Sequence, residues 1–496
     1  MTDPAQPPKP GVNQWKTLDK DLHRIGLLEE ATQFVSRPLV APGLALAFVV
    51  LAGLLAAVLT GAQAGTAIIV AAAVIGAYMA LNIGANDVAN NMGPAVGAKA
   101  LSLGWALLIA AVFETAGALI AGGDVVKTVA TGILSPDAVP DSGQFTWAMM
   151  AALLASALWL NLATWLGAPV STTHSIIGGV AGAGIVAAGW GAVNWGSLGM
   201  IALSWVVSPI LGGLIAAGFL ALIKARIMYV ADKIAAALFW VPVLIGVMAG
   251  GFATYLIYKG LGALLHVSLG TATVIGLATG VIVWALWRPV VRRQAAGLEN
   301  RKKSLRKLFA FPLVASAALL SFAHGANDVS NAVGPLAAIV QMAGGNGISG
   351  EVSIPLWVMV VGALGISVGL VLFGPKLIQL IGSEITKLNP MRAFCVALSA
   401  AVTVIAASWL GLPVSSTHIA VGGIFGVGFY REWHAERRAQ MLGLQKGRPV
   451  PVEERSRRYL VRRAHLATIG TAWVVTVPVS ALIAAGLYLA MTAFAG

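Results

Sequence analysis

Two nearly identical polar phrases interrupt apolar stretches of the chain, about half its length apart. Residues 84–94 read GANDVANNMGP and residues 325–335 read GANDVSNAVGP, so eight of eleven positions agree at an offset of 241. If each phrase is helical, Asn86 and Asn90 share one face with Asp87 beside them, and the second copy repeats this arrangement. Carboxylates and amides are costly to bury, so a duplicated set is a functional-site hypothesis, and their oxygens suit a small cation or a proton.

Glycine and proline flank each phrase. Gly84 and Gly325 allow close backbone approach, whereas Pro94 and Pro335 interrupt a helix that would continue downstream. We therefore expect a helix break at each phrase, which would free backbone carbonyls and N–H groups to bind ions. A polar clamp that only packs broken helices together is the structural alternative, and the duplicated aspartate favours the cation or proton role.

A second duplicated constellation consists of proline followed by hydroxyl side chains and histidine. PVSTTH at 169–174 pairs with PVSSTH at 413–418, at an offset of 244. Serine and threonine after proline predict a helix start, where the first-turn N–H groups stay free and can bind an oxyanion. The hydroxyls can also bond back to their own helix. His174 and His418 fit either helix packing or contact with a substrate or proton.

Two further ionisable residues lie in apolar sequence near the phrases. Glu114 is a lone carboxylate between Ala106 and Ala121, and it suits either a polar tether between helices or a coupling role. His324 directly precedes the second phrase, where Ile83 holds the matching place in the first. A pH-sensitive role fits this histidine, although a satisfied buried histidine is the favoured interpretation.

The elements that position these residues are predicted to be transmembrane helices. Of 496 residues, 58% are hydrophobic and only 10% are charged, whereas roughly a quarter are charged in soluble proteins. Many apolar runs reach the roughly 20 residues that cross a bilayer, and together they predict about a dozen crossings. Such runs do not match the alternating strands of a barrel. The single cysteine excludes a disulfide framework and a cysteine zinc site. The predicted fold is all-α, a polytopic helical membrane protein.

The basic loops fix its orientation and indicate inverted repeats with broken or re-entrant helices. Lysine and arginine are concentrated in loops 288–307 and 431–463, and the positive-inside rule places these loops in the cytoplasm. We therefore interpret the basic residues as determinants of topology that lie near membrane lipid, and we expect no nucleic-acid partner. A third match, 204–218 with 472–486, makes loop 190–197 the counterpart of 431–463. That loop has two tryptophans and no lysine or arginine. Equivalent loops therefore face opposite sides, as in inverted-repeat transporters.

The same matches set the predicted domain boundaries. An extension precedes the first repeat, and linking helices follow it. We expect a cytoplasmic N-terminal extension with an extra transmembrane helix at 1–62, transport repeat 1 at 63–222, linking helices with a basic cytoplasmic loop at 223–307, and transport repeat 2 at 308–496.

Taken together, these motifs resemble those of the inorganic phosphate transporter (PiT) family. The resemblance covers roughly residues 65–496 and includes FETAG at 113–117. It implies symport of inorganic phosphate with Na⁺ or H⁺ by alternating access across the cell membrane. It also implies no enzyme activity, no cofactor beyond the coupling ion, and often a homodimer. The family's site positions fall on Asn86, Asp87, Asn90, Ser171, Thr172, Thr173, Asn327, Asp328, Asn331, Ser415, Ser416 and Thr417.

From this resemblance and the chemistry above, we assign the residues to separate roles. Phosphate is expected to bind Ser171, Thr172, Thr173, Ser415, Ser416, Thr417, Asn86 and Asn327. The coupling cation is expected to bind Asp87, Asn90, Asp328 and Asn331, with Asp87 and Asp328 as metal ligands if the ion is Na⁺. Coupling or structural roles are expected for Glu114, His174, His324 and His418.

Other functions stay open at this point. A sulfate–proton symporter could use the same scaffold, and an ion channel would differ by lacking concentrative uptake and a coupled cation. An enzyme is disfavoured because Ser171 and His174 are close neighbours on one short segment, and because no Walker-type phosphate loop is present.

Overall fold

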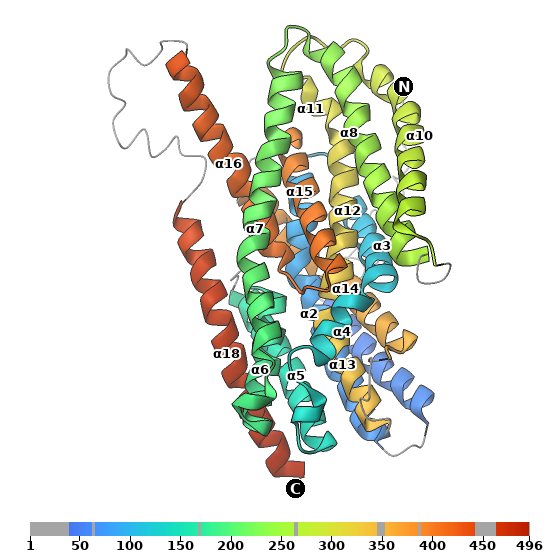
Figure 1. The fold of residues 1–496 in the computed structure, drawn as a ribbon, viewed down its shortest axis with the longest axis vertical. Coiled ribbons are helices and arrows are strands. Elements are labelled where there is room, and N and C mark those ends of the chain that lie inside the picture. The colour runs from blue at the N-terminus through green and yellow to red at the C-terminus, as the bar shows by residue number, and fades with distance from the viewer. Residues whose placement is uncertain are drawn as a thin grey trace, which may run out of the picture. The chain divides into compact units, whose positions relative to one another are not determined.

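The computed structural model describes residues 39–61, 65–166, 170–261, 266–344, 353–384, 388–441 and 463–495. They are almost entirely helical (Figure 1), and the only strand-like pairing among them is an isolated bridge between Leu134 and Val193. In this part of the chain, eleven helices are long and apolar enough to cross a membrane. The predicted all-α, polytopic membrane fold is therefore confirmed.

The helices form two sets joined by a linking segment. The first set comprises α2 (Thr66–Gly97), α3 (Leu103–Ala121), α4 (Gly123–Thr131), α5 (Ser142–Leu166), α6 (Thr172–Ala188) and α7 (Trp195–Ile223). The linking segment contains a π-helical turn (Lys224–Met228), α8 (Lys233–Leu256), α10 (Leu269–Ala295) and α11 (Leu305–Leu308). The second set comprises α12 (Ala310–Asp328), α13 (Ser330–Ala343), α14 (Leu356–Glu384), α15 (Pro390–Trp409), α16 (Ser416–Met441) and α18 (Arg463–Ala495). A further apolar helix covers Leu39–Thr60.

Glycines bring the two sets into backbone contact in symmetry-related pairs. A Cβ on Gly84 of α2 would lie 1.9 Å from the carbonyl oxygen of Ile366 in α14. A Cβ on Gly325 of α12 would lie 2.1 Å from the carbonyl oxygen of Glu114 in α3. The two glycines are equivalent in the repeat, and Glu114 and Ile366 hold equivalent places in α3 and α14. A two-fold axis between the repeats therefore relates the α2–α14 contact to the α12–α3 contact.

The last helix of each set packs against the other set. Gly422 of α16 faces the carbonyl oxygen of Pro209 in α7, and Gly178 of α6 faces that of Val477 in α18, each too closely for any larger residue. One apolar cluster of the core is centred on α5, α6 and α13, and another is centred on α8, α12 and α15. The repeats thus share their cores through exchanged helices.

Each set contains a helical hairpin whose tip carries one of the hydroxyl motifs. From these tips, α6 and α16 lead toward opposite ends of Figure 1. The tips are in contact, because Thr173 Oγ1 donates to the carbonyl oxygen of Val414 at 3.0 Å. The expectation of inverted repeats with re-entrant helices is confirmed.

The helix breaks are not where the prolines predicted them. Helix α2 continues through Pro94 to Gly97 without a break, and α13 continues through Pro335 to Ala343. The break of the second repeat lies instead at Val329, between α12 and α13. A proline removes one backbone hydrogen bond, and in membrane helices neighbouring groups and local adjustment compensate for that loss.

Some expectations concern residues that the structure does not describe. Residues 1–38 of the expected N-terminal extension and residues 442–462 of the expected basic loop lie outside the described residues. So does Pro169, the first residue of one hydroxyl motif. The predicted domain boundaries stay predictions.

Candidate functional site

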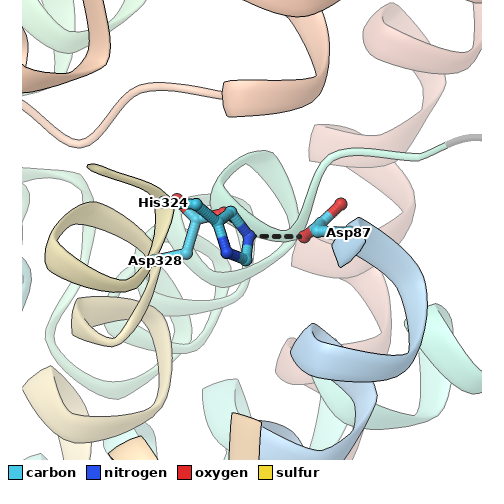
Figure 2. A group of neighbouring side chains, drawn as sticks. All are labelled: Asp87, His324 and Asp328. Carbon is cyan, nitrogen blue, oxygen red and sulfur yellow. Dashed lines mark ion pairs between the residues drawn. The ribbon is translucent and has the colours of Figure 1, made fainter. Parts of the chain in front are cut away.

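Three carboxylates from three helices surround one imidazole. His324 Nε2 lies 3.0 Å from Asp328 Oδ2, one turn further along α12, and 3.9 Å from Asp87 Oδ2 on α2 (Figure 2). On the other side of the ring, His324 Nδ1 lies 3.3 Å from Glu114 Oε1 on α3. All four side chains are buried. The structure therefore gathers both predicted aspartates with the two ionisable residues that the sequence left between coupling and structural roles.

This cluster is rich in acceptors and poor in donors. A neutral imidazole would turn a lone pair toward one of the carboxylates, whereas a protonated ring presents N–H groups on both sides. Even then one cation faces three acids, and buried charges without partners are costly. Asp87 Oδ2, Glu114 Oε2 and Asp328 Oδ1 are buried without a hydrogen-bond partner among the described residues. Ligand atoms of Asp87, His324 and Asp328 lie within 4.8 Å of one another. The cluster can therefore take up a small cation or protons.

One arm of the cluster exists on only one side of the two-fold axis. Asn91 Nδ2 donates to Glu114 Oε1 at 2.9 Å, and Glu114 in turn lies beside His324. The equivalent positions of the other repeat hold buried apolar side chains, Ala332, Ile366 and Ile83. The aspartates are duplicated, but the acid–imidazole arm is single. Sequence reasoning missed Asn91, although its signal was visible as the one asparagine of the first phrase that the second phrase replaces with alanine.

The hydroxyl motifs begin helices, as the sequence predicts. Ser171 caps α6, and its Oγ accepts a hydrogen bond from the backbone N–H of His174 at 3.2 Å. Ser415 does the same at the start of α16, where its Oγ accepts from the N–H of His418 at 3.3 Å. Both hydroxyls remain able to donate their proton. The first intrahelical bond runs from Ser175 N–H to the Ser171 carbonyl, so the preceding amides belong to the donor-rich end that binds anions.

The hydroxyl tip of the second repeat contacts the polar phrases of both repeats. Thr417 Oγ1 donates to Asp87 Oδ1 at 3.0 Å and accepts from Asn90 Nδ2 at 2.8 Å. Ser416 Oγ lies 3.4 Å from Asp328 Oδ2. The predicted anion-binding hydroxyls and the predicted cation-binding acids are therefore direct neighbours.

The hydroxyl tip of the first repeat makes the symmetry-related contact. Asn331 Nδ2 donates to Thr173 Oγ1 at 3.3 Å and lies 3.4 Å from Thr172 Oγ1. Asn331 is the repeat equivalent of Asn90, and Thr173 is the equivalent of Thr417. Each repeat thus lends its hydroxyl tip to the asparagine of the other.

Asn86 and Asn327 hold the hairpin tips in place. The Nδ2 of Asn86 donates to the carbonyl oxygen of Val170 at 3.2 Å. Asn327 donates through Nδ2 to the carbonyl oxygen of Leu412 at 3.1 Å and accepts through Oδ1 from the N–H of Val414 at 3.1 Å. The sequence assigned both asparagines to phosphate. Their amides bond to the backbone of the tips, and each also donates to a side chain, Asn86 Nδ2 to Asp87 Oδ1 and Asn327 Nδ2 to Ser408 Oγ, both at 3.0 Å.

The two histidines of the hydroxyl motifs pack against each other behind the tips. The rings of His174 and His418 are 4.6 Å apart, and His174 meets Trp205 edge-on at 3.8 Å. The indole Nε1 of Trp205 donates to the carbonyl oxygen of Pro413 at 3.1 Å. Both rings therefore make packing contacts, and the choice between a packing role and contact with a substrate or proton stays a prediction.

Comparisons with known proteins agree with this architecture. A family model described as the phosphate transporter family matches residues 83–484. A "Putative phosphate permease" of Helicobacter pylori strain J99 is 45% identical over 525 residues, covering 95% of this chain and 98% of that protein. Another, of Thermococcus kodakarensis, is 36% identical over 417 residues, covering 84% and 95%.

A solved structure extends the similarity to three dimensions. It is named "The sodium-dependent phosphate transporter", is 34% identical, and aligns with a TM-score of 0.77 over 86% of this chain and 99% of that one. The match covers both repeats, and the similar proteins are permeases or transporters and not enzymes. The chain therefore belongs to the phosphate transporter family, as a multi-pass membrane protein.

Proposed function

We propose that this protein carries inorganic phosphate together with a coupling cation across the cell membrane by alternating access. The observation that carries the proposal is the contact between Thr417 and Asp87. It joins a hydroxyl of the candidate anion site to an acid of the candidate cation site. Phosphate as the substrate is supported by the names of the similar permeases.

The anion is proposed to bind between the two hairpin tips. Each tip offers the start of a helix, with first-turn N–H groups and clustered hydroxyls around Ser171 and Ser415. Helix starts favour negative charge, and they bind phosphate without any nearby lysine or arginine. The phosphate contacts proposed are Ser171, Thr172, Thr173, Ser415, Ser416 and Thr417, with Asn86 and Asn327 placing the tips.

The coupling cation is proposed to bind Asp87 and Asp328, with Asn90 and Asn331 beside them. Na⁺ is favoured by the name of the solved relative, a sodium-dependent transporter, and His324 with Glu114 gives the same site a group that can hold a proton. Bound cations lower the cost of placing an anion next to two buried acids. Because such coupling is reciprocal, bound phosphate must also strengthen cation binding.

Alternating access is proposed to follow from the hairpins. They lead away from a common meeting point in opposite directions (Figure 1). Among the described residues, the tips touch through the hydrogen bond from Thr173 to the carbonyl oxygen of Val414. A movement of one hairpin away from the other would open the site to one side of the membrane, which is the general behaviour of inverted repeats around a central site.

The test is uptake of labelled phosphate into proteoliposomes, with Na⁺ and pH gradients imposed separately. Concentrative uptake with one gradient alone identifies the coupling ion, and exchange without concentration under either gradient would contradict symport. The paired variant Ser171→Ala with Ser415→Ala should weaken phosphate uptake more than cation binding. A matched control is Ser156→Ala with Ser399→Ala, because each of these buried hydroxyls on the same hairpins donates to a carbonyl oxygen of its own helix.

A further inference from the structure

An apolar groove runs between α7 and α16, away from the transport site. Its volume is about 710 Å³. Its floor is backbone, because a Cβ on Gly426 would lie 2.0 Å from the carbonyl oxygen of Gly213. Its walls are exposed apolar side chains, among them Leu214, Phe429 and Trp433. Glycines at the contact and large residues beside it thus create a slot along α16 and the candidate membrane span α7.

The end of this groove at Tyr430 and Trp433 adjoins a cluster of basic side chains. Lys224 Nζ sits 4.7 Å from the centre of the Tyr430 ring, which joins the ends of α7 and α16. Four further cations lie within electrostatic reach of Lys224, namely Arg431, Arg392, Lys302 and Arg438. Glu432 is the acid beside Arg431. Among the described residues, five cations therefore gather beside this end, the basic mouth of the groove, with Glu432 next to one of them.

His434 lies among these cations. Burial, together with the charges of Lys224 and Arg438, lowers the pKa of His434 below its ordinary value. His434 also stacks on Tyr229, with ring centres 5.4 Å apart, and the guanidinium of Arg438 lies 4.3 Å from the centre of that same ring. Lys224 and Arg438 are therefore held against aromatic rings.

We propose that an anionic phospholipid occupies this groove, with an acyl chain along α7 and α16 and its phosphate among Lys224, Arg431 and Arg438. An acyl chain would match the apolar part of the groove, and an anionic headgroup would match its basic mouth. The apolar part lies between α7 and α16, and the basic mouth lies on the side that the positive-inside rule assigns to the cytoplasm. Basic pockets between transmembrane helices on that side characteristically bind anionic headgroups.

Two other occupants, free phosphate and a second copy of the chain, would each match only one part of the groove. Free phosphate would pair with the cations and leave the apolar walls uncovered. An apolar helix of a second copy would cover the walls but would bring no negative charge to the five cations. The bound lipid would also affect the transport site. Helix α16 begins at the hydroxyl tip and reaches the basic mouth, so the lipid would stabilise the position of the helix that carries Thr417.

The test is lipid binding to the purified full-length protein, measured by native mass spectrometry. Phosphatidylglycerol and phosphatidylcholine with identical acyl chains are titrated separately. Each basic group near an anionic headgroup contributes roughly fivefold in affinity. Lys224→Gln with Arg431→Gln should therefore weaken phosphatidylglycerol binding roughly twenty-fivefold and leave phosphatidylcholine binding nearly unchanged. The control Arg292→Gln with Arg293→Gln removes two exposed charges from the end of α10 and should change neither.

A second variant tests the apolar half. Ala217 lines the groove, so Ala217→Phe should fill it and weaken both lipids while leaving the basic mouth intact. Unchanged elution as a single species would show that each variant is folded. Equal binding of both lipids by the native protein would overturn the proposal, as would full retention of phosphatidylglycerol by the charge variant. Displacement of that lipid by inorganic phosphate alone would assign the cations to a free anion, and cross-linking of Leu214 to a second copy would assign the groove to a protein interface.

Discussion

Converting the polar arm of the site into its apolar counterpart would separate a structural role from a coupling role. The arm consists of Asn91, Glu114 and His324. The informative variants are Glu114→Ile alone and the triple change Asn91→Ala, Glu114→Ile and His324→Ile. The fold already accommodates these apolar residues at the symmetry-related positions, where Ala332, Ile366 and Ile83 are buried.

The expected magnitudes follow from the contacts of Glu114. Its Oε1 lies 2.9 Å from the Asn91 amide nitrogen and 3.3 Å from His324 Nδ1. At an effective dielectric constant of about 20, unit charges at this separation interact by about 5 kcal/mol before desolvation. Removing one member of a buried pair costs about 3–5 kcal/mol, because the other is left unpaired. Glu114→Ile alone leaves the Asn91 amide without its acceptor but leaves His324 beside Asp328, so it should lower the free energy of unfolding by at most about this amount. The triple variant should recover the part that comes from Asn91.

Both variants should nevertheless lose coupled transport. If removal of the Glu114 charge weakens the free energy of cation binding by about 3 kcal/mol, the affinity for the cation falls roughly hundredfold. The assay is gradient-driven uptake of labelled phosphate into proteoliposomes, alongside denaturant unfolding. Ile366→Val and Ile83→Val on the apolar side serve as controls that should retain uptake. A triple variant that is stable and transports at nearly the native rate would refute the reasoning, because the arm would then serve packing alone.

Three further outcomes are expected. Asp87→Asn and Asp328→Asn should each abolish gradient-driven uptake while the protein still inserts, since size and hydrogen bonding are kept and the charge is lost; near-normal concentrative uptake by both would contradict this. Arsenate should compete well with labelled phosphate and sulfate poorly, because a buried acceptor left without a donor costs about 1–3 kcal/mol; equal displacement by sulfate would favour a sulfate carrier. In a Cys395→Ala background, which removes the chain's single cysteine, cysteines at the exposed Gly191 and Gln440 should react with an impermeant reagent from opposite sides; labelling from one side would oppose the inverted repeat.

The class of fold and the inverted repeat could be predicted from the sequence because they depend on terms that act locally. Long apolar runs transfer favourably into the bilayer whatever their partners are. The charge of a loop sets its side of the membrane independently of how the helices pack. The helix starts at Ser171 and Ser415 were predictable for a similar reason, since a capping hydroxyl reaches only the next turn of its own chain.

Proline gave a weaker signal. It predicted breaks at Pro94 and Pro335, whereas the break of the second phrase lies at Val329 and α2 continues through Pro94. The cost of one missing N–H bond in a membrane helix depends on which neighbours can compensate for it. That information is not contained in the local sequence.

The composition of the site was decided by the tertiary structure. Both phrases and both hydroxyl motifs are visible in the sequence, but the contact of Thr417 with Asp87 joins residues 330 positions apart. It arises because the two repeats exchange helices, so that glycine contacts between α2 and α14 and between α3 and α12 fix the depth of each phrase. The same packing places Glu114 and Asp328 on opposite sides of His324. Apolar periodicity predicts that a helix is buried, but only the close approach of particular backbones determines which polar groups meet inside it.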